Sequence, residues 1–137
     1  MRDQFTNISQ FDVNVLVVAP SKATFIQQFQ NVFGPFPFPI YGDPSRKLYR
    51  HMGHVSMAKW KLLGMAAIGF IFGKVKDFIP KEEAKKKFVL KSMKTQDVFI
   101  QGGTWLYSSE GKIIWKHIDQ NPEKHAKIHD IMEQLQK

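Results

Sequence analysis

The chain has 137 residues, about the size of one compact domain, and 43% of them are apolar and 13% aromatic, which excludes wholesale disorder. It contains no cysteine, which excludes a disulfide scaffold, a zinc–thiolate site and any thiol nucleophile within these residues. The formal net charge of +8 favours acidic partners.

The excess positive charge is confined to the middle of the chain. Residues 1–43 carry two basic and three acidic side chains, for a net charge of −1. Residues 44–94 carry thirteen basic and three acidic side chains, for +10, and residues 95–137 carry five basic and six acidic side chains, for −1. The middle also holds the longest apolar run, eleven residues from Leu62 to Phe72. A bilayer span takes about 20 residues, and the N-terminus lacks the apolar core of a secretory signal. We therefore expect a soluble, cytoplasmic protein.

The N-terminal third predicts a helix, a strand and a second helix. Arg2 to Phe11 carries apolar residues on one helical face, and the β-branched run Val13 to Val18 is typical of a strand buried on both faces. Ser21 can then cap a helix that ends at Gly34. Its apolar residues repeat with the helical period: Phe25, Ile26, Phe29, Val32 and Phe33.

The next segment predicts a short edge strand and more helix. Prolines confine the strand to Phe38 to Tyr41, and Asp43 followed by Pro44 predicts an N-cap and the first position of a helix that ends at Gly53. Residues 55–79 favour a helix, and residues 80–95 favour a lysine-rich connection with a helical turn. Together they predict a basic helical insertion at about 55–95.

The C-terminal third predicts a hairpin and a last helix. Strand-like runs at 103–107 and 113–117 flank the turn 108–111, and Asn121-Pro122 is typical of a helix start. A strand–helix–strand unit followed by a hairpin and a helix is the order of the back portion of a thioredoxin-like fold. We predict one α/β domain over residues 1–137, an incomplete thioredoxin-like fold with a central mixed sheet of about four strands flanked by helices.

Three stretches resemble the peroxiredoxin-like AhpC/TSA family. Residues 38–50, FPIYGDPSRKLYR, are similar to its short strand, Asp-Pro, basic pair and Leu-Tyr. Gln101-Gly102-Gly103-Thr104-Trp105, followed by Glu110-Gly111-Lys112 and His117, resembles its Gly-Gly strand and hairpin, and the basic segment around Lys59-Trp60-Lys61 also has a family counterpart. The resemblance implies a thioredoxin-like fold and, for the family, thiol-dependent peroxide reduction.

The departure from the family falls at its active site. Redox-active members carry their cysteine at the start of the first helix, and Arg2-Asp3-Gln4-Phe5 resembles the residues just after it, which puts Met1 near the second cysteine position. Gly103 lies near the cis-proline position of thioredoxins. The resemblance thus implies a vestigial active-site rim of Met1, Arg2, Gly103 and Thr104, with no catalytic residue. A longer natural protein with an upstream cysteine motif, a cysteine-free paralogue with a binding or structural role, and a truncation all remain open.

The histidines suggest metal binding only weakly. His125 and His129 lie four residues apart on the predicted last helix, with His117 as a third candidate, and His51 and His54 flank Gly53. The plainer interpretation is solvated histidines, or cations at a helix end. We predict no metal and no cofactor, and a capping role for Asp43.

The sequence predicts a homodimer. If the first strand of the fold is missing, a strand edge is exposed around Phe38, Ile40 and Tyr41, and edges of that kind are paired or covered in native proteins. Segment 55–79 adds the apolar residues Met57, Trp60, Leu63, Met65, Ile68 and Phe72.

The same segment suggests a second kind of partner. It could instead lie in an anionic membrane surface, with lysines 74 to 94 adding attraction. Specific nucleic-acid binding is not expected, because only Phe78 and Phe88 lie among those lysines.

Overall fold

The computed structural model describes residues 4–56, 80–95, 100–121 and 124–136. The predictions for Met1 and Arg2 lie outside the described residues, and so does most of the helix predicted at 55–79, from residue 57 onward. That part includes the interface candidates Met57, Trp60, Leu63, Met65, Ile68 and Phe72. The first two residues of the predicted helix, Val55 and Ser56, are described and are not helical, since Ser56 forms an isolated antiparallel bridge with Ile100.

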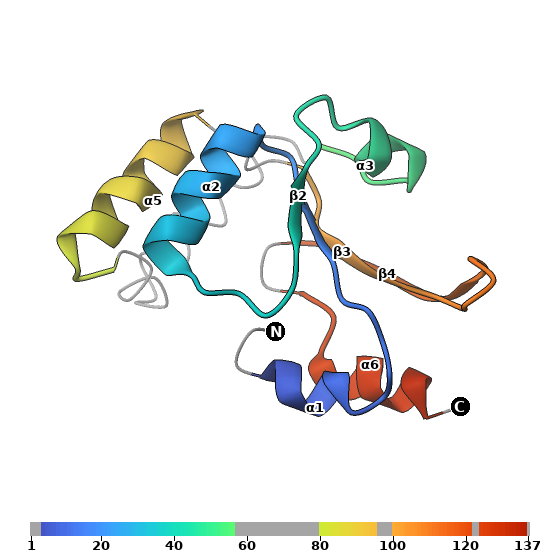
Figure 1. The fold of residues 1–137 in the computed structure, drawn as a ribbon. Coiled ribbons are helices and arrows are strands. Elements are labelled where there is room, and N and C mark those ends of the chain that lie inside the picture. Colours follow the sequence, from blue (N-terminus) through green and yellow to red (C-terminus); the bar gives the residue numbers. More distant parts are fainter. Residues whose placement is uncertain (1–3, 57–79, 96–99, 122–123, 137) are drawn as a thin grey trace.

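Helices and strands alternate along the first half of the chain, and a hairpin and a helix close it (Figure 1). The described elements are α1 (Phe5–Ser9), β1 (Val17–Ala19), α2 (Ala23–Phe33), β2 (Ile40–Gly42), α3 (Lys47–His51), α5 (Glu83–Thr95), β3 (Gly103–Tyr107), β4 (Ile113–Ile118) and α6 (Ile128–Leu135).

Within the described part of the chain, the four strands form two separate pairs. β1 and β2 are parallel, with Val17 opposite Ile40, and β3 and β4 are antiparallel, with Gly103 opposite Ile118. The predicted four short strands and mixed α/β character are confirmed, but the strands are not hydrogen-bonded into the single central sheet that we expected.

Helix α2 lies between α5 and β2 (Figure 1). Phenylalanine rings pack between α2 and α5. The Phe88 ring of α5 is 9% exposed and lies 4.8 Å from that of Phe25 and 5.7 Å from that of Phe33, measured between centroids. Ring contacts continue through Phe29, Phe36, Phe38 and Phe5. Among the described residues, the most buried aliphatic ones are Ile8 of α1 and Ile131 of α6, which lie at the other end of the molecule.

Two predicted helix starts are displaced. The N-cap of α2 is Lys22, without a side-chain cap hydrogen bond, instead of Ser21. α3 begins at Lys47 instead of Pro44, because residues 43–46 first form a turn in which the Arg46 N–H donates to the Asp43 carbonyl at 2.9 Å. Asp43 still caps the helix, since its carboxylate accepts from the N–H groups of Lys47 and Leu48.

Two other segments depart from the sequence-based prediction. The predicted lysine-rich connection at 80–95 is mostly the 13-residue helix α5, which burial of Phe88 against α2 stabilises. α6 begins at Ile128 and not at Asn121-Pro122, because Lys127 is extended. His125 therefore lies in the loop before α6, and the predicted spacing of His125 and His129 on one helix is wrong.

Candidate functional site

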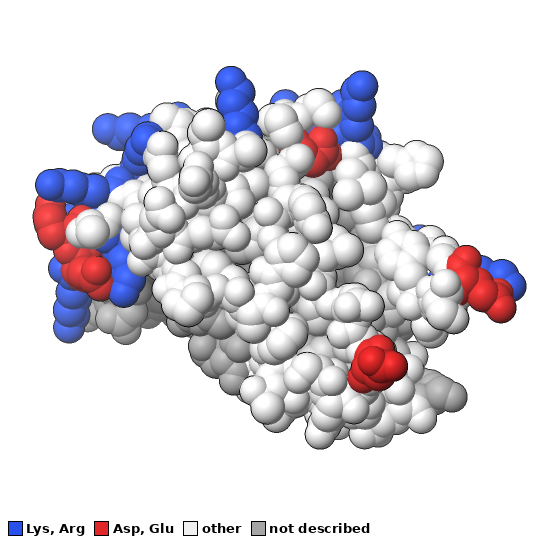
Figure 2. Space-filling view, viewed as in Figure 1, with Lys and Arg blue, Asp and Glu red and all other residues white. Residues whose placement is uncertain are grey.

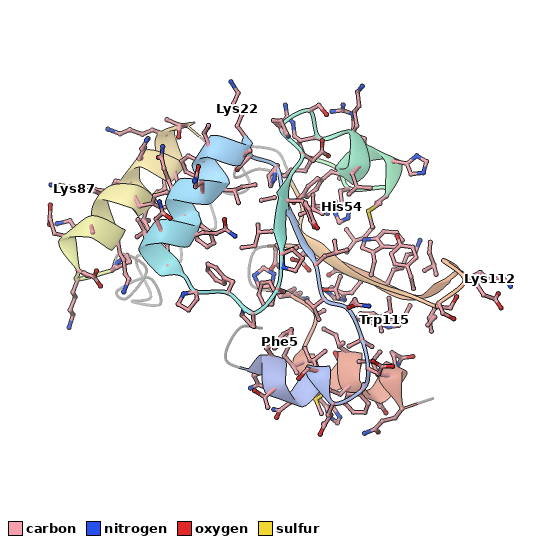
Figure 3. All side chains as sticks on the ribbon, in the orientation of Figure 1. Phe5, Lys22, His54, Lys87, Lys112 and Trp115 are labelled. Carbon is pink, nitrogen blue, oxygen red and sulfur yellow. The ribbon has the colours of Figure 1, made fainter. Side chains whose placement is uncertain are left out.

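The end of α3 directs His54 into the interior of the molecule. Gly53 has a φ of +84°, and the His54 N–H donates to the Tyr49 carbonyl at 2.9 Å, which closes the helix C-terminus. The His54 side chain then points toward the hairpin (Figure 3). Only 6% of His54 is exposed, so its contacts are made inside the protein.

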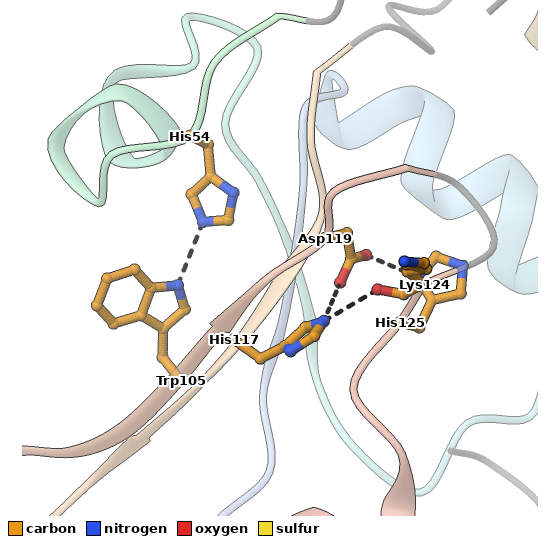
Figure 4. A network of polar contacts seen from close by, with 6 residues as sticks. All are labelled: His54, Trp105, His117, Asp119, Lys124 and His125. Atoms are coloured by element: carbon orange, nitrogen blue, oxygen red, sulfur yellow. Dashed lines mark hydrogen bonds and ion pairs between the residues drawn. The ribbon is translucent and has the colours of Figure 1, made fainter.

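A hydrogen bond joins His54 to the hairpin. The Trp105 indole Nε1–H donates to His54 Nε2 across 3.2 Å (Figure 4). Indole only donates, so Nε2 is the acceptor and the neutral imidazole carries its proton on Nδ1. That Nδ1 is buried and has no hydrogen-bond partner in the described part of the chain. The His54 ring is thus buried, its tautomer is fixed by Trp105, and its Nδ1–H donates to no group among the described residues.

Tyr49 connects this ring to β1. Its ring lies edge-on to His54 at 5.4 Å between centroids, and its hydroxyl donates to the Val18 carbonyl at 2.7 Å. Since Val17 N–H and the Ala19 carbonyl bond toward β2, the Val18 carbonyl faces the opposite edge of β1. Burial, with the nearby Asp43 carboxylate, raises the pKa of the Tyr49 phenol to about 12.

Two glycines allow these groups to approach the start of β3. A Cβ on Gly103 would lie 2.6 Å from the His117 carbonyl oxygen and 2.6 Å from His54 Cε1, and a Cβ on Gly102 would lie 2.6 Å from Asp119 Oδ2. No side chain fits there without displacing backbone or ring. The Gly-Gly pair therefore makes room for His54 and Asp119.

A second polar cluster lies on the other side of the hairpin base (Figure 4). Asp119 is 5% exposed, and its Oδ2 accepts from His125 Nδ1 at 2.6 Å. His117 Nε2 lies 2.9 Å from the Lys124 carbonyl, an acceptor, so His117 carries its proton on Nε2. Asp119 Oδ1 lies 3.5 Å from that nitrogen, which is an ion-pair contact when His117 is protonated.

The Asp119–His125 pair reaches the surface through the histidine. The Asp119 carboxylate accepts from His125 Nδ1, and the His125 side chain is 68% exposed. Thiol peroxidase chemistry also needs a thiolate, and the sequence holds no cysteine. What these contacts do is hold the base of the hairpin to α3 and to the segment before α6.

The structure unites some of the predicted site residues. Gly103 faces His54, and Thr104 is paired with His117 across the hairpin. His51 is exposed at the end of α3 while His54 is buried, so these two do not converge. No group of three potential ligands suits a metal ion within the described ranges.

The sequence analysis missed two members of the site. It named His54 only as a metal candidate and did not identify its contact with Trp105, and it did not identify Asp119 at all. The signal was the pair Gly102-Gly103 ahead of a strand, since glycine there often marks a close approach of other groups.

A second candidate site is the outward face of α5. Leu90 is 40% and Met93 53% exposed, and Lys86 and Lys94 lie on the same helical face, opposite the buried Phe88. Figure 2 shows lysine and arginine side chains around this side of the molecule, with acidic side chains among them. Glu83 lies in the first turn of α5, and Glu82 precedes it. In the described part of the chain, no helix is long and apolar enough to cross a membrane.

The comparison with protein families identifies the class of this domain. The model for AhpC/TSA antioxidant enzymes matches residues 1–121. The chain therefore belongs to the AhpC/TSA family, and its fold is an incomplete thioredoxin-like α/β fold, as the sequence predicted. No curated protein and no solved structure gave a match.

Proposed function

We propose that this chain is a non-catalytic AhpC/TSA domain that acts by binding an anionic membrane surface. The observation that carries the proposal is the absence of cysteine from a member of a thiol-dependent antioxidant family. A thiolate is the nucleophile of such chemistry, and a methionine thioether has no proton to lose. Binding is the activity that the remaining surface supports.

The outward face of α5 suits an anionic membrane. Exposed Leu90 and Met93 can enter the acyl boundary, while Lys86 and Lys94 beside them meet anionic headgroups. The Lys87 ammonium lies 3.7 Å from Glu83, a pair so exposed that solvent leaves it weak. Since the cytoplasmic leaflet carries the anionic lipids, we propose a cytoplasmic location.

Vesicle co-sedimentation tests the electrostatic part of this proposal. We expect binding to vesicles that contain phosphatidylserine and none to pure phosphatidylcholine, with affinity falling as salt rises. Each lysine near the surface contributes about 1 kcal/mol, so Lys86→Gln with Lys94→Gln should weaken binding about 30-fold. The matched control, Lys112→Gln with Lys124→Gln, removes the same charge elsewhere. No binding at low salt, or an equal loss in both double variants, would refute the proposal.

An apolar variant separates insertion from simple adsorption. Leu90→Ser with Met93→Ser keeps every charge on α5 but removes the side chains expected to enter the membrane. We expect this variant to bind vesicles more weakly than the parent chain at every salt concentration tested. Binding unchanged by this variant would mean that α5 adsorbs by charge alone and would contradict the inserted helix.

Peroxide consumption tests the non-catalytic part. With thioredoxin or a small dithiol as reductant, we expect the purified chain to consume peroxide no faster than buffer. Measurable turnover would show that the cysteine argument is wrong, whatever the vesicle assay shows.

The exposed edge of β2 favours self-association as a second proposal. Tyr41 is 57% exposed, and among the described residues β2 pairs with β1 alone, so its outer edge offers free backbone groups. We propose a homodimer through Phe38, Ile40 and Tyr41. Light scattering after size exclusion should give a dimer that Tyr41→Lys shifts to monomer, because a charge on an edge strand opposes pairing. A parent chain that is monomeric at all micromolar concentrations contradicts the dimer.

A further inference from the structure

Two side chains of the kind that bind metals share one face of the hairpin base. His117 lies in β4 and Asp119 follows the end of this strand, and residues two apart on an extended strand point to the same side. The Asp119 N–H donates to the Gly102 carbonyl at 3.0 Å, which fixes the backbone of Asp119 against the residue before β3. The sequence His-x-Asp therefore brings an imidazole and a carboxylate to one place.

The chain then returns and brings a third donor atom to the same place. The Lys124 N–H donates to the Asn121 carbonyl at 3.1 Å, and the Lys124 carbonyl oxygen lies 2.9 Å from His117 Nε2. Asp119 Oδ1 lies 3.5 Å from that nitrogen. Figure 4 shows both oxygens on the side of the His117 ring that carries Nε2. One ring nitrogen and two oxygens thus converge from two segments of the chain.

A single N–H does not satisfy both oxygens. The His117 Nε2–H donates to the Lys124 carbonyl, and the buried Asp119 Oδ1 accepts no hydrogen bond within the described part of the chain. A buried carboxylate oxygen without a donor costs free energy, and in native proteins such an atom calls for an explanation, such as a bound ion or water. The surroundings of Oδ1 therefore favour a positively charged ligand.

The separations between these atoms suit a metal ion. Zn²⁺ binds imidazole nitrogen and carboxylate oxygen at about 2.0 to 2.2 Å, so two such ligands lie about 2.9 Å apart at a right angle and about 3.4 Å apart at a tetrahedral angle. The two observed separations from His117 Nε2, 2.9 and 3.5 Å, agree with these values. His125 Nδ1 holds the other carboxylate oxygen, Oδ2, at 2.6 Å, and outer hydrogen bonds of this kind orient ligating carboxylates.

We propose that His117, Asp119 and the Lys124 carbonyl bind a divalent transition-metal ion such as Zn²⁺. The ion replaces the proton on His117 Nε2, which leaves to solvent, and accepts electron pairs from Nε2, from Oδ1 and from the carbonyl oxygen. No set of three metal-binding side chains surrounds one point in the described ranges, and the His117 side chain is 33% exposed, so water completes the coordination. The ion is therefore exchangeable. This site does not depend on the membrane-binding face of α5.

Titration calorimetry with Zn²⁺ on the untagged, chelator-treated chain tests the proposal. We expect one equivalent of Zn²⁺ to bind saturably and Mg²⁺ not to bind, because imidazole is a ligand for transition metals and Mg²⁺ prefers oxygen. A long-range proton–nitrogen NMR spectrum provides the second readout. The His117 ring should change from the Nε2–H to the Nδ1–H tautomer when Zn²⁺ is added, which a purely structural hydrogen bond would not do.

Variants of the three side chains separate direct from indirect effects. His125→Ala removes only the outer hydrogen bond to the carboxylate and should weaken Zn²⁺ binding about tenfold. His117→Gln and Asp119→Asn each remove a ligand and should weaken it more than His125→Ala does. The matched control is His129→Gln, which removes an exposed imidazole from α6, outside this cluster. We expect it to leave Zn²⁺ binding unchanged.

Three results would overturn the proposal. They are the lack of saturable Zn²⁺ binding to the folded parent chain, equal weakening by His129→Gln and His117→Gln, and Zn²⁺ binding that leaves the His117 tautomer unchanged. Circular dichroism confirms that each variant is folded. If the buried Asp119→Asn substitution prevents folding, His117→Gln at the partly exposed ligand still decides the outcome.

Discussion

The two halves of the described structure are held together by different interactions. Between α2 and α5 the contacts are aromatic, with Phe88 among the rings of Phe25, Phe29 and Phe33. At the base of the β3–β4 hairpin they are polar, with His54 bonded to Trp105 and Asp119 bonded to His125. The aromatic half has lysines around it (Figure 2), and the polar half buries two polar side chains, His54 and Asp119, at the base of the hairpin.

Because of this difference, we expect the two halves to tolerate different substitutions and to have different roles. Apolar contacts depend on buried area and need no directed partner, so the aromatic half can carry charged side chains on its exterior without disturbing them. A buried hydrogen bond depends on distance and direction, and leaving one partner unpaired costs more than the bond contributes. We therefore expect membrane binding on the α2–α5 side, and a structural role for the histidine contacts together with the proposed metal site.

The largest effect should follow from removing the central ring of the aromatic half. Phe88→Ala empties space between α2 and α5, and large-to-small changes at such sites cost about 3 to 5 kcal/mol of unfolding free energy. Urea denaturation measures this cost. Leu90→Ala on the exposed face of the same helix should cost under about 1 kcal/mol. Equal effects of the two variants would show that α5 is not held to α2 by Phe88.

A methyl group at the hairpin base tests the polar half. Gly103→Ala adds a Cβ within 2.6 Å of the His117 carbonyl oxygen and of the His54 ring, so backbone and ring must both move. Overpacking of this kind costs about 1 to 3 kcal/mol. The Trp105 indole proton should also shift in an NMR spectrum, because its acceptor His54 is displaced.

The neighbouring position provides the control for that variant. Thr104→Ala removes side-chain atoms from the next residue of β3, whereas Gly103→Ala adds a side-chain atom. The Thr104 variant therefore leaves room for His54 beside Gly103. We expect it to keep the Trp105 indole resonance in place. If Gly103→Ala also leaves that resonance in place, the hairpin base is more adaptable than its contacts imply.

The sequence predicts some elements of the structure better than others. Elements with a local sequence signal are predicted well, and those that depend on distant contacts are not. The periodic apolar residues of α2 and the turn between β3 and β4 are local signals, and both elements form close to where they were expected. The length of helix α5 was underestimated, because its sequence is rich in lysine and only Phe88 is buried. The contribution of Phe88 to stability depends on aromatic rings that lie far away in the sequence. Local pattern contains no information about a partner 60 residues away.

The candidate sites depend even more on distant partners. The contact between His54 and Trp105 spans 51 positions. The separation of the strands into two pairs has the same cause, because pairing depends on which edges the rest of the fold brings together. The sequence could indicate that Gly102-Gly103 allows other groups to approach closely, but it could not identify those groups as His54 and Asp119.

Alkaline pH should weaken the link between β1 and the polar half. Burial raises the pKa of Tyr49 to about 12 from 10.0, so the folded state favours the neutral phenol. A raised folded-state pKa gives stability that is complete below about pH 10 and is lost as pH rises through about 12. Tyr49→Phe should cost about 1 kcal/mol at neutral pH and flatten this alkaline loss. Tyr107→Phe on the exposed hairpin serves as the control, and an equal change there would contradict the assignment.

Acid should produce the smallest effect, at the start of α3. Desolvation raises the pKa of the Asp43 carboxyl, but hydrogen bonds from Ser45 and from the backbone of Leu48 and Lys47 outweigh it, and the net pKa lies below 3.8. A lowered folded-state pKa gives stability that is present above about pH 4 and is lost as pH falls through the folded value. The difference in unfolding midpoint between the parent and Asp43→Asn should therefore be greatest near neutral pH and shrink in acid.

Ser45→Ala tests the same cap without removing its charge. It deletes one of the hydrogen bonds to Asp43 and should give a smaller difference of the same sign, which also shrinks in acid. Because Tyr49 lies on α3 and reaches both β1 and His54, a loosened cap should also shift the Trp105 indole resonance slightly. If that resonance does not move while the unfolding midpoint does, the cap stabilises α3 alone and the polar half is independent of it.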